Sequence, residues 1–161
     1  MLKIRTATNS DWEWILKESE PIGGVQVVSL GVLHSLEDYE AIVAVEGGER
    51  KGFAVYRVVL PGVELLALRA VEQWTGIGTG LLRELEERVK QLEAKSIFLC
   101  TTNDNLSALR FYQRRGYHLK ALNAGQFREV LALKGLDPGS KVIGLDGIAI
   151  RDEIVLEKTE L

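Results

Sequence analysis

The chain alternates between two hydrophobic periods, and each change of period marks a predicted strand or helix. Apolar residues, many of them β-branched or aromatic, fill three closely spaced runs at 40–46, 52–59 and 63–70. Such runs, separated by Gly-Gly and Pro-Gly, are typical of an antiparallel meander. A shorter alternation at residues 2–5 predicts an additional strand at the start of the chain.

Helical periodicity replaces strand alternation after Gly78. Apolar residues recur at helical spacing and charged residues fill the positions between them, which predicts an amphipathic helix with one apolar face. The apolar face consists of Leu81, Leu82, Leu85, Val89 and Leu92. Capping residues and a terminal glycine predict three further helices: one near 9–19, a short one at 35–38, and one of roughly ten residues that ends at Gly116.

The remaining segments complete an α/β pattern. The continuous apolar run 97–100 predicts a strand that is covered on both faces, and 117–122 and 148–157 predict two more strands. Apart from the short helix, the stretch 25–38 has no clear period, and 123–147 is polar and rich in glycine. A meander followed by helix, strand, helix and strand predicts an α/β or α+β domain of three layers.

Composition then narrows the class of protein. The 161 residues suit a single domain, 1–161, better than two. The net charge of -3 argues against a general nucleic-acid binder, because binding to phosphates needs a basic excess. The single cysteine, the polar N-terminus and the lack of a long apolar run predict a cytoplasmic protein without a membrane span.

The first candidate site is the glycine-rich sequence 73–80, between a predicted strand and the amphipathic helix. Free N–H groups and the positive end of a helix suit a phosphate or pyrophosphate, and glycines let it come close. A Walker loop would need Lys after Gly80, and a dinucleotide fingerprint would need Gly where Leu81 stands, so both interpretations fail. A tight turn that binds nothing is the alternative.

The second candidate site begins at Asn105, which can cap a helix. Tyr112 lies one residue off the apolar stripe expected to face the core, which consists of Leu106, Leu109 and Phe111. A neutral phenol, with a pKa of about 10, can lend a proton to a departing thiolate whose thiol has a pKa of about 8.5. Taken alone, the segment favours a structural tyrosine with a satisfied hydroxyl.

Together, the two segments strongly resemble the GNAT superfamily of acetyl-CoA-dependent N-acetyltransferases. Gln-x-x-Gly-x-Gly starts at residue 73, and Asn-x-x-Ala-x-x-Phe-Tyr-x-x-x-Gly-Tyr starts at residue 105. The runs 101–105 and 144–153 also look like a bacterial and archaeal branch of that family. The resemblance covers nearly the whole chain. It implies a mixed central sheet of six or seven strands with helices on both faces, and a splay between the strands 63–70 and 96–101 that admits the cofactor.

The resemblance also assigns roles to individual residues. The positions that match cofactor-binding residues are Leu66, Ala67 and Leu68, through the backbone, then Trp74, Thr75, Gly76, Ile77, Gly78 and Thr79 in the pyrophosphate turn, and Asn105. Tyr112 matches the tyrosine that protonates the coenzyme A thiolate. Glu64 is the candidate general base, because a carboxylate beside the thioester attracts an ammonium group; an ordinary strand-end glutamate is the alternative. Trp74 and Thr75 replace the Gly and Arg of many relatives, so Trp74 either lies over the adenine or covers the loop.

The implied activity is transfer of an acetyl group from acetyl-CoA to a primary amine by direct attack, with no covalent acetyl-enzyme. The alternative is a catalytically inactive acyl-CoA sensor or assembly module. No metal is expected, because His34 and His118 are far apart in sequence and no cluster has metal-ligand spacing. Cys100 is predicted to be a core residue. The expected partner is a small-molecule or peptide amine, with no nucleic acid and no membrane, and the family's frequent dimers leave a homodimer open.

Overall fold

A computed structural model describes residues 1–161 and divides the chain into two compact units. The first unit comprises Met1–Val27, His34–Ile97 and Leu161, and the second comprises Val28–Leu33 and Phe98–Glu160. Each unit is described by itself. That residues 1–161 form a single domain stays a prediction.

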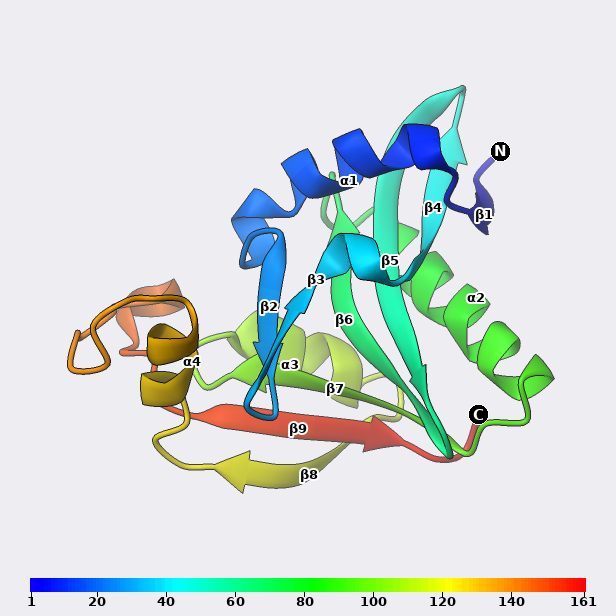
Figure 1. The fold of residues 1–161 in the computed structure, drawn as a ribbon. Helices are drawn as coiled ribbons and strands as arrows, with labels where there is room; N and C mark the ends of the chain where they lie inside the picture. Colours follow the sequence, from blue (N-terminus) through cyan, green and yellow to red (C-terminus); the bar gives the residue numbers. More distant parts are fainter. The chain divides into compact units, whose positions relative to one another are not determined.

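The first unit contains the predicted meander. Its strands are β1 (Lys3–Thr6), β4 (Glu40–Glu46), β5 (Glu49–Val59) and β6 (Gly62–Ala70), which lie in the order β1-β4-β5-β6 (Figure 1). Each pair of neighbours is antiparallel. The bounds of β4 equal the predicted run 40–46, because Val and Ile fill it and Gly47-Gly48 end it.

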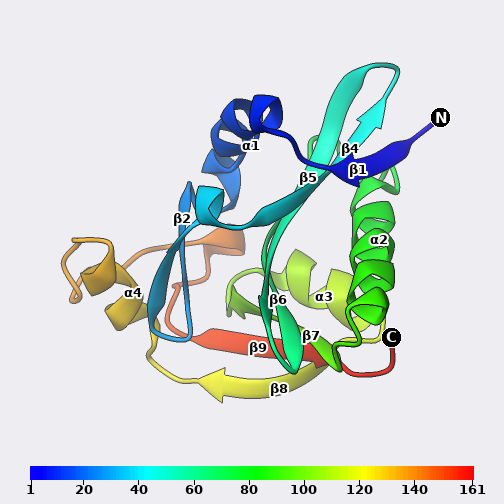
Figure 2. The ribbon, with the colours of Figure 1, turned by 45° about the vertical axis from the view of Figure 1, so that its right-hand side comes forward.

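Helices cover both faces of this part of the sheet. Helix α1 (Trp12–Glu18) and helix α2 (Ile77–Gln91) lie on opposite sides of β4 and β5, as Figure 2 shows. A Cβ on Gly52 would lie 2.6 Å from the Arg69 carbonyl oxygen, so only glycine lets β5 approach its neighbours this closely. The core on the α1 side consists of Ile15, Leu36, Ala41, Val43, Phe53, Val55 and Ala67.

The second unit contains the remaining strands of the main sheet. These are β7 (Ser96–Thr102), whose first residues belong to the first unit, β8 (His118–Asn123) and β9 (Glu153–Lys158), in the order β7-β9-β8. Strand β8 is antiparallel to β9. With the meander they give seven strands and a mixed α/β fold, as predicted.

Two further α-helices and four 3-10 helices accompany α1 and α2. Helix α3 (Leu106–Gln113) and helix α4 (Phe127–Leu133) belong to the second unit. The 3-10 helices are η1 (Asn9–Asp11), η2 (Glu20–Ile22), η3 (Leu36–Asp38) and η4 (Leu145–Gly147). None of these helices is long and apolar enough to cross a bilayer. The predicted helix near 9–19 is confirmed, since η1 is followed directly by α1.

Two features differ from the expectations. The stretch without a clear period forms a hairpin of β2 (Gln26–Ser29) and β3 (Val32–Ser35). Its turn places Leu30 at φ 51° and Gly31 at φ 78°. Asn or Gly usually occupies the first of these left-handed positions. Because Leu30 stands there, the sequence carries no turn signal from which the hairpin could be predicted.

The last strand is also shorter than predicted, since β9 begins at Glu153 and not at residue 148. The backbone of residues 149–152 bonds outside the ladder: the Ile150 N–H group donates to the Val142 carbonyl at 2.9 Å, and several other groups bond to the side chain of Asn103. The Asn103 Oδ1 atom accepts from the backbone N–H groups of Arg151 at 2.9 Å and Asp152 at 3.1 Å, and Asn103 Nδ2 donates to the Ala149 carbonyl at 3.0 Å. Alternation along the sequence predicts a strand here, but hydrogen bonds to the Asn103 side chain hold backbone groups that a strand would pair with its neighbour.

Candidate active site

The glycine-rich turn lies between β6 and α2, and its residues 71–76 are exposed. Gly76 has φ 84° and stands at the N-cap of α2, where no side chain caps the helix. The Thr75 hydroxyl donates to the Glu72 carbonyl at 2.9 Å and so closes the turn on itself. An uncapped N-terminus in an exposed turn gives backbone donors and a positive dipole end, which fit a pyrophosphate.

Trp74 stands apart from the rest of this turn. Its side chain is 89% exposed, and its φ of 66° lies in the left-handed region. That conformation costs a non-glycine residue about 1–2 kcal/mol. A ring this exposed contacts little of the protein, which argues against the interpretation that Trp74 covers the loop.

Strand β6 contains a bulge at Leu66. Val55 pairs with Ala67, but the next residue, Tyr56, pairs with Leu65, so Leu66 is an extra residue in the register. Bulges re-aim the side chains next to them because they interrupt the alternation of faces. Both Leu66 and Ala67 therefore contact the core on the α1 side. Side chains before the bulge swap faces relative to an unbroken strand.

Glu64 is one of the side chains that the bulge re-aims. It lies within β6 and is only 1% exposed. Arg57 is its register partner on β5, and the Arg57 Nε and Nη2 atoms each lie 2.8 Å from Glu64 Oε2. The other carboxylate oxygen, Oε1, is buried without a hydrogen-bond partner. One half of the carboxylate is thus paired and the other half is bare.

His34, on β3, completes a group of polar residues that sequence analysis did not assign to the site. Its ring is 4% exposed, its Nδ1 atom lies 2.8 Å from the Tyr39 hydroxyl, and its Nε2 atom has no partner. Burial lowers the pKa of His34; the charge of Arg57 lowers it further, and that of Glu64 opposes the shift. We call His34, Tyr39, Arg57 and Glu64 the buried polar cluster. No pattern in the sequence singled out His34, because the stretch 25–38 has no clear period.

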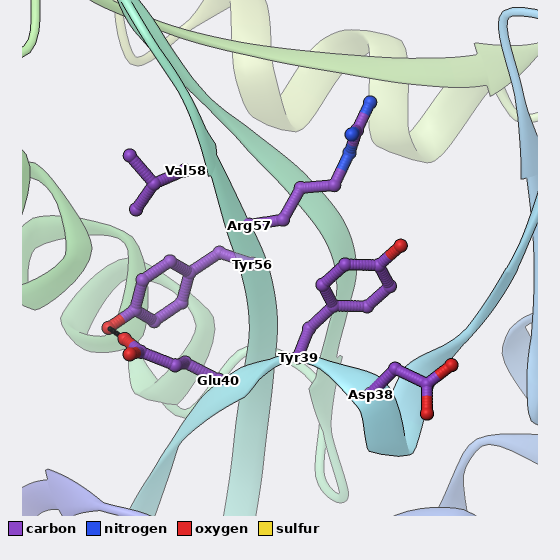
Figure 3. Close-up of a pocket in the computed structure, with 6 residues that line it drawn as sticks. All are labelled: Asp38, Tyr39, Glu40, Tyr56, Arg57 and Val58. Carbon is purple, nitrogen blue, oxygen red and sulfur yellow. Dashed lines mark hydrogen bonds between the residues drawn. The ribbon is translucent and has the colours of Figure 1, made fainter.

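A pocket of about 380 Å³ lies beside the cluster, and Tyr39 and Arg57 belong to both. Figure 3 shows that Tyr56 and Val58 leave β5 on one side and Arg57 leaves it on the other. The Tyr56 hydroxyl donates to Glu40 Oε2 at 3.0 Å. The pocket is lined by Asp38, Tyr39, Glu40, Tyr56, Arg57 and Val58.

In the second unit, Asn105 and Tyr112 both lie on or beside α3. The Asn105 Oδ1 atom accepts from the Ala108 backbone N–H at 3.1 Å, so Asn105 is the predicted N-cap. This bond uses the carbonyl oxygen of the side chain and leaves its amide nitrogen as a donor. The residue can therefore cap the helix and bind a ligand at the same time.

Tyr112 is the buried residue of α3, with 7% exposure, whereas Leu106, expected in the core, is 44% exposed. The predicted stripe is wrong here because the Tyr112 ring packs edge-on against Phe111 and Tyr117, with centroids 5.0 and 5.5 Å away. Burial raises the pKa of Tyr112, and the charge of Arg115 opposes this only in part. The phenol therefore stays protonated throughout the neutral range.

Cys100 is half-buried in β7, so it is less enclosed than a core residue. The Ser29 hydroxyl donates to its sulfur at 3.1 Å. Across the protein, no group of three or more His, Cys, Asp and Glu side chains is arranged to hold a metal ion.

Comparison with known proteins decides the family. The sequence model of the Acetyltransferase (GNAT) family matches residues 5–117. The chain belongs to the GNAT acetyltransferase family. The chain is 35% identical over 132 residues to the uncharacterized protein YdhI of Bacillus subtilis (strain 168), and the alignment covers 81% of this chain and 80% of that one.

Solved structures show that the fold is that of GNAT proteins. A GNAT acetyltransferase from Elizabethkingia anophelis with acetyl-CoA bound has a TM-score of 0.74 at 20% identity, covering 98% of this chain and 97% of that one. A Bacillus subtilis acetyltransferase in complex with CoA has a TM-score of 0.72 at 23% identity, with both chains covered completely. The predicted family, fold class and enzyme class, an acyltransferase, are confirmed.

Proposed function

We propose that this GNAT protein moves an acetyl group from acetyl-CoA to a primary amine by direct attack. The observation that carries the proposal is Tyr112, a buried phenol held neutral on α3 at the family's position for the thiolate acid. An inactive acyl-CoA sensor needs the pyrophosphate turn but not this acid. The sensor is therefore the rival that experiment must exclude.

The donor acetyl-CoA supplies an activated thioester when it is bound. On the protein's side, the N-terminus of α2 and the turn from Trp74 to Thr79 would hold the pyrophosphate, which suits an uncapped helix end. The backbone of Leu66 to Leu68 would pair with the pantetheine arm, and the splay predicted between 63–70 and 96–101 would admit it. The Asn105 amide nitrogen would donate a further hydrogen bond.

On the acceptor side, Glu64 supplies a buried negative charge that attracts an ammonium group. An amine must lose a proton before its nitrogen can attack a thioester. The bare Oε1 atom of Glu64 is free to contact that group, while Arg57 fixes the other oxygen.

Tyr112 acts at the opposite end of the reaction. The amine nitrogen forms the new C–N bond, the C–S bond breaks, and its electron pair goes to sulfur. The Tyr112 hydroxyl hydrogen-bonds this sulfur and gives it a proton. The proton that the nitrogen loses then restores the Tyr112 hydroxyl. Burial raises the pKa of a thiol as well as that of a phenol, so the transfer stays feasible in a dry site. Half-buried Cys100 takes no part, and no acetyl-enzyme forms.

Two measurements test this function. Calorimetry should detect acetyl-CoA binding, and a thiol-release assay over a panel of primary amines should find at least one acceptor with a matching acetylated product. Tight binding of acetyl-CoA without thiol release for any amine would favour the sensor. A cytoplasmic location and a small-molecule or peptide acceptor remain part of the proposal, and a homodimer stays open.

A further inference from the structure

Two buried polar atoms of the first unit point to a ligand. Only three buried side-chain atoms of the protein have no hydrogen-bond partner: His34 Nε2, Glu64 Oε1 and Arg69 Nε. The first two belong to the buried polar cluster, whereas Arg69 pairs its charge with Glu18 at 3.5 Å. Buried polar atoms are rarely left unpaired, because losing water without gaining a partner is unfavourable. Two such atoms in one cluster are explained if a ligand pairs with both.

The two side chains have complementary chemistry. Arg57 occupies one oxygen of Glu64 with two donors, which leaves the other oxygen to hold a cation. His34 is buried and its Nδ1 atom is held by the Tyr39 hydroxyl. When Nδ1 donates to the Tyr39 oxygen, Nε2 carries a lone pair and can accept a proton.

We propose that His34 and Glu64 form the acceptor site of the enzyme, in which Glu64 Oε1 holds the ammonium group and His34 Nε2 removes its proton. The inference rests on the proposed acetyl transfer and deepens it. It names the substrate class as alkyl primary amines, which are protonated at neutral pH and so need both a counter-charge and a base. Tyr39 is a positioning residue, since it acts through the imidazole.

The protons balance over the reaction. The ammonium group gives its first proton to His34, which passes it to water after the reaction. The neutral nitrogen then forms the C–N bond and loses a second proton, which balances the proton that the sulfur receives. The nitrogen keeps its third hydrogen in the amide product. One proton is released per acetyl group transferred.

The charges around the ring fix the direction of the pH dependence. The groups that act on His34 are Tyr39 before β4, Arg57 on β5 and Glu64 on β6. Burial and Arg57 lower the pKa of His34, so the imidazole is neutral and ready to accept a proton at pH 7. Activity should fall only when the pH drops below the ordinary histidine range of about 6.5.

The test compares His34→Gln with His118→Gln, the same substitution at the chain's other histidine, which is exposed on β8. With an alkyl amine accepted by the wild type, kcat/KM at pH 7 should fall by roughly 10²–10⁴ in His34→Gln, the usual worth of a general base. His118→Gln should stay within about threefold of the wild type, as expected for a residue that takes no part in chemistry.

Raising the pH separates a base from a structural residue. Near pH 10 the amine loses its proton in solution, so the deficit of His34→Gln should shrink steadily, whereas a packing defect would persist. A deficit that is equal at pH 7 and pH 10, or absent at pH 7, would overturn the inference while leaving acetyl transfer intact. Failure of the wild type to release thiol with any amine would instead overturn the proposed function, and this inference with it.

A measurement on the unaltered protein covers the case in which His34→Gln does not fold. Only two histidines contribute to the NMR spectrum of histidine-labelled protein, and His118→Gln assigns them. With CoA bound, the accepted alkyl amine should shift the His34 ring signals and leave those of His118 unchanged. Unchanged His34 signals at a saturating amine concentration would contradict the inference.

Discussion

Two buried carboxylates in the first unit, Asp11 and Glu64, have similar surroundings but differ in how many of their oxygens accept hydrogen bonds. Asp11 has 0% exposure and Glu64 has 1%, and each is paired with arginine. Both oxygens of Asp11 are used: Arg5 donates at 2.6 and 3.0 Å, Arg50 at 2.8 Å and the Thr8 backbone N–H at 2.8 Å. Glu64 has a single partner, Arg57, on one oxygen.

Under the proposed function, the difference separates a structural carboxylate from a functional one. Asp11 ties η1 to β1 and β5 and has no capacity left for a ligand. Glu64 keeps one oxygen bare at a cost in stability, which a protein retains where a ligand later pairs with the atom. Burial by itself therefore does not distinguish the two carboxylates, whereas their hydrogen bonding does.

The largest effect on stability is expected at the satisfied carboxylate. Asp11→Asn should lower the free energy of unfolding by about 3 kcal/mol, at the low end for a broken buried pair because Arg5 and Arg50 can turn to water. Urea titration measures this loss, and kcat of the folded variant should match that of the wild type. A loss below about 0.5 kcal/mol, typical of a surface substitution, would contradict a structural role.

The same carboxylate predicts a pH dependence of stability. The hydrogen bond from Arg5 lowers the pKa of Asp11 well below its usual value, although burial opposes the shift. Because the folded-state pKa is depressed, the stabilisation is present above the ordinary carboxylate pKa of about 3.9 and is lost as the pH falls below it. Wild-type stability should therefore fall more steeply in acid than that of Asp11→Asn.

The next largest effect is expected for Glu64→Gln, and it should appear in kcat/KM more than in the free energy of unfolding. Glu64→Gln keeps the size of the side chain but removes the charge that holds an ammonium, so kcat/KM should fall roughly 10- to 100-fold, the worth of a hydrogen bond to a charged group. The free energy of unfolding should fall by less than in Asp11→Asn, because only one of the two oxygens has a partner to lose. A large loss of stability with unchanged kcat/KM would show that Glu64, like Asp11, has a structural role and no functional one.

The smallest effect is expected at the exposed turn. Trp74 holds a left-handed φ without packing against the protein, so Trp74→Gly should raise the free energy of unfolding by about 1 kcal/mol. If the indole lies over the adenine, the affinity for CoA should fall while that for pantetheine stays constant. Calorimetry with both ligands distinguishes this from a turn residue that contacts neither.

Local patterns in the sequence predict much of the fold and part of the site. The meander, α2 and the cap at Asn105 follow from residue type and spacing, which act over a few neighbouring residues. Tyr112 is found only because a family motif places it, since the helical stripe itself pointed to other residues. Helix α4, in the polar segment 123–147, was missed because glycines surround its few apolar residues.

The rest depends on contacts between distant residues. The orientation of Glu64 follows from the bulge at Leu66, which shows only in the pairing of β5 with β6. The proposed role of His34 depends on Arg57 and Glu64, which lie more than twenty positions away in the sequence. Gly144 is required because a Cβ there would meet the Asp104 carboxylate. Such dependencies leave no periodic trace in the sequence.

The most direct test of the central claim removes one hydroxyl from each of two buried tyrosines and compares kcat. Tyr112→Phe and Tyr56→Phe should each change the free energy of unfolding by about 1 kcal/mol, the net worth of one hydrogen bond. Tyr112→Phe should lower kcat and kcat/KM together by roughly 10²–10⁴, the mark of a general acid, with unchanged affinity for acetyl-CoA. Tyr56→Phe should leave both within about threefold of the wild type, as expected for a satisfied structural hydroxyl. Equal kcat values for the two variants, or an effect of Tyr112→Phe confined to KM, would contradict the account.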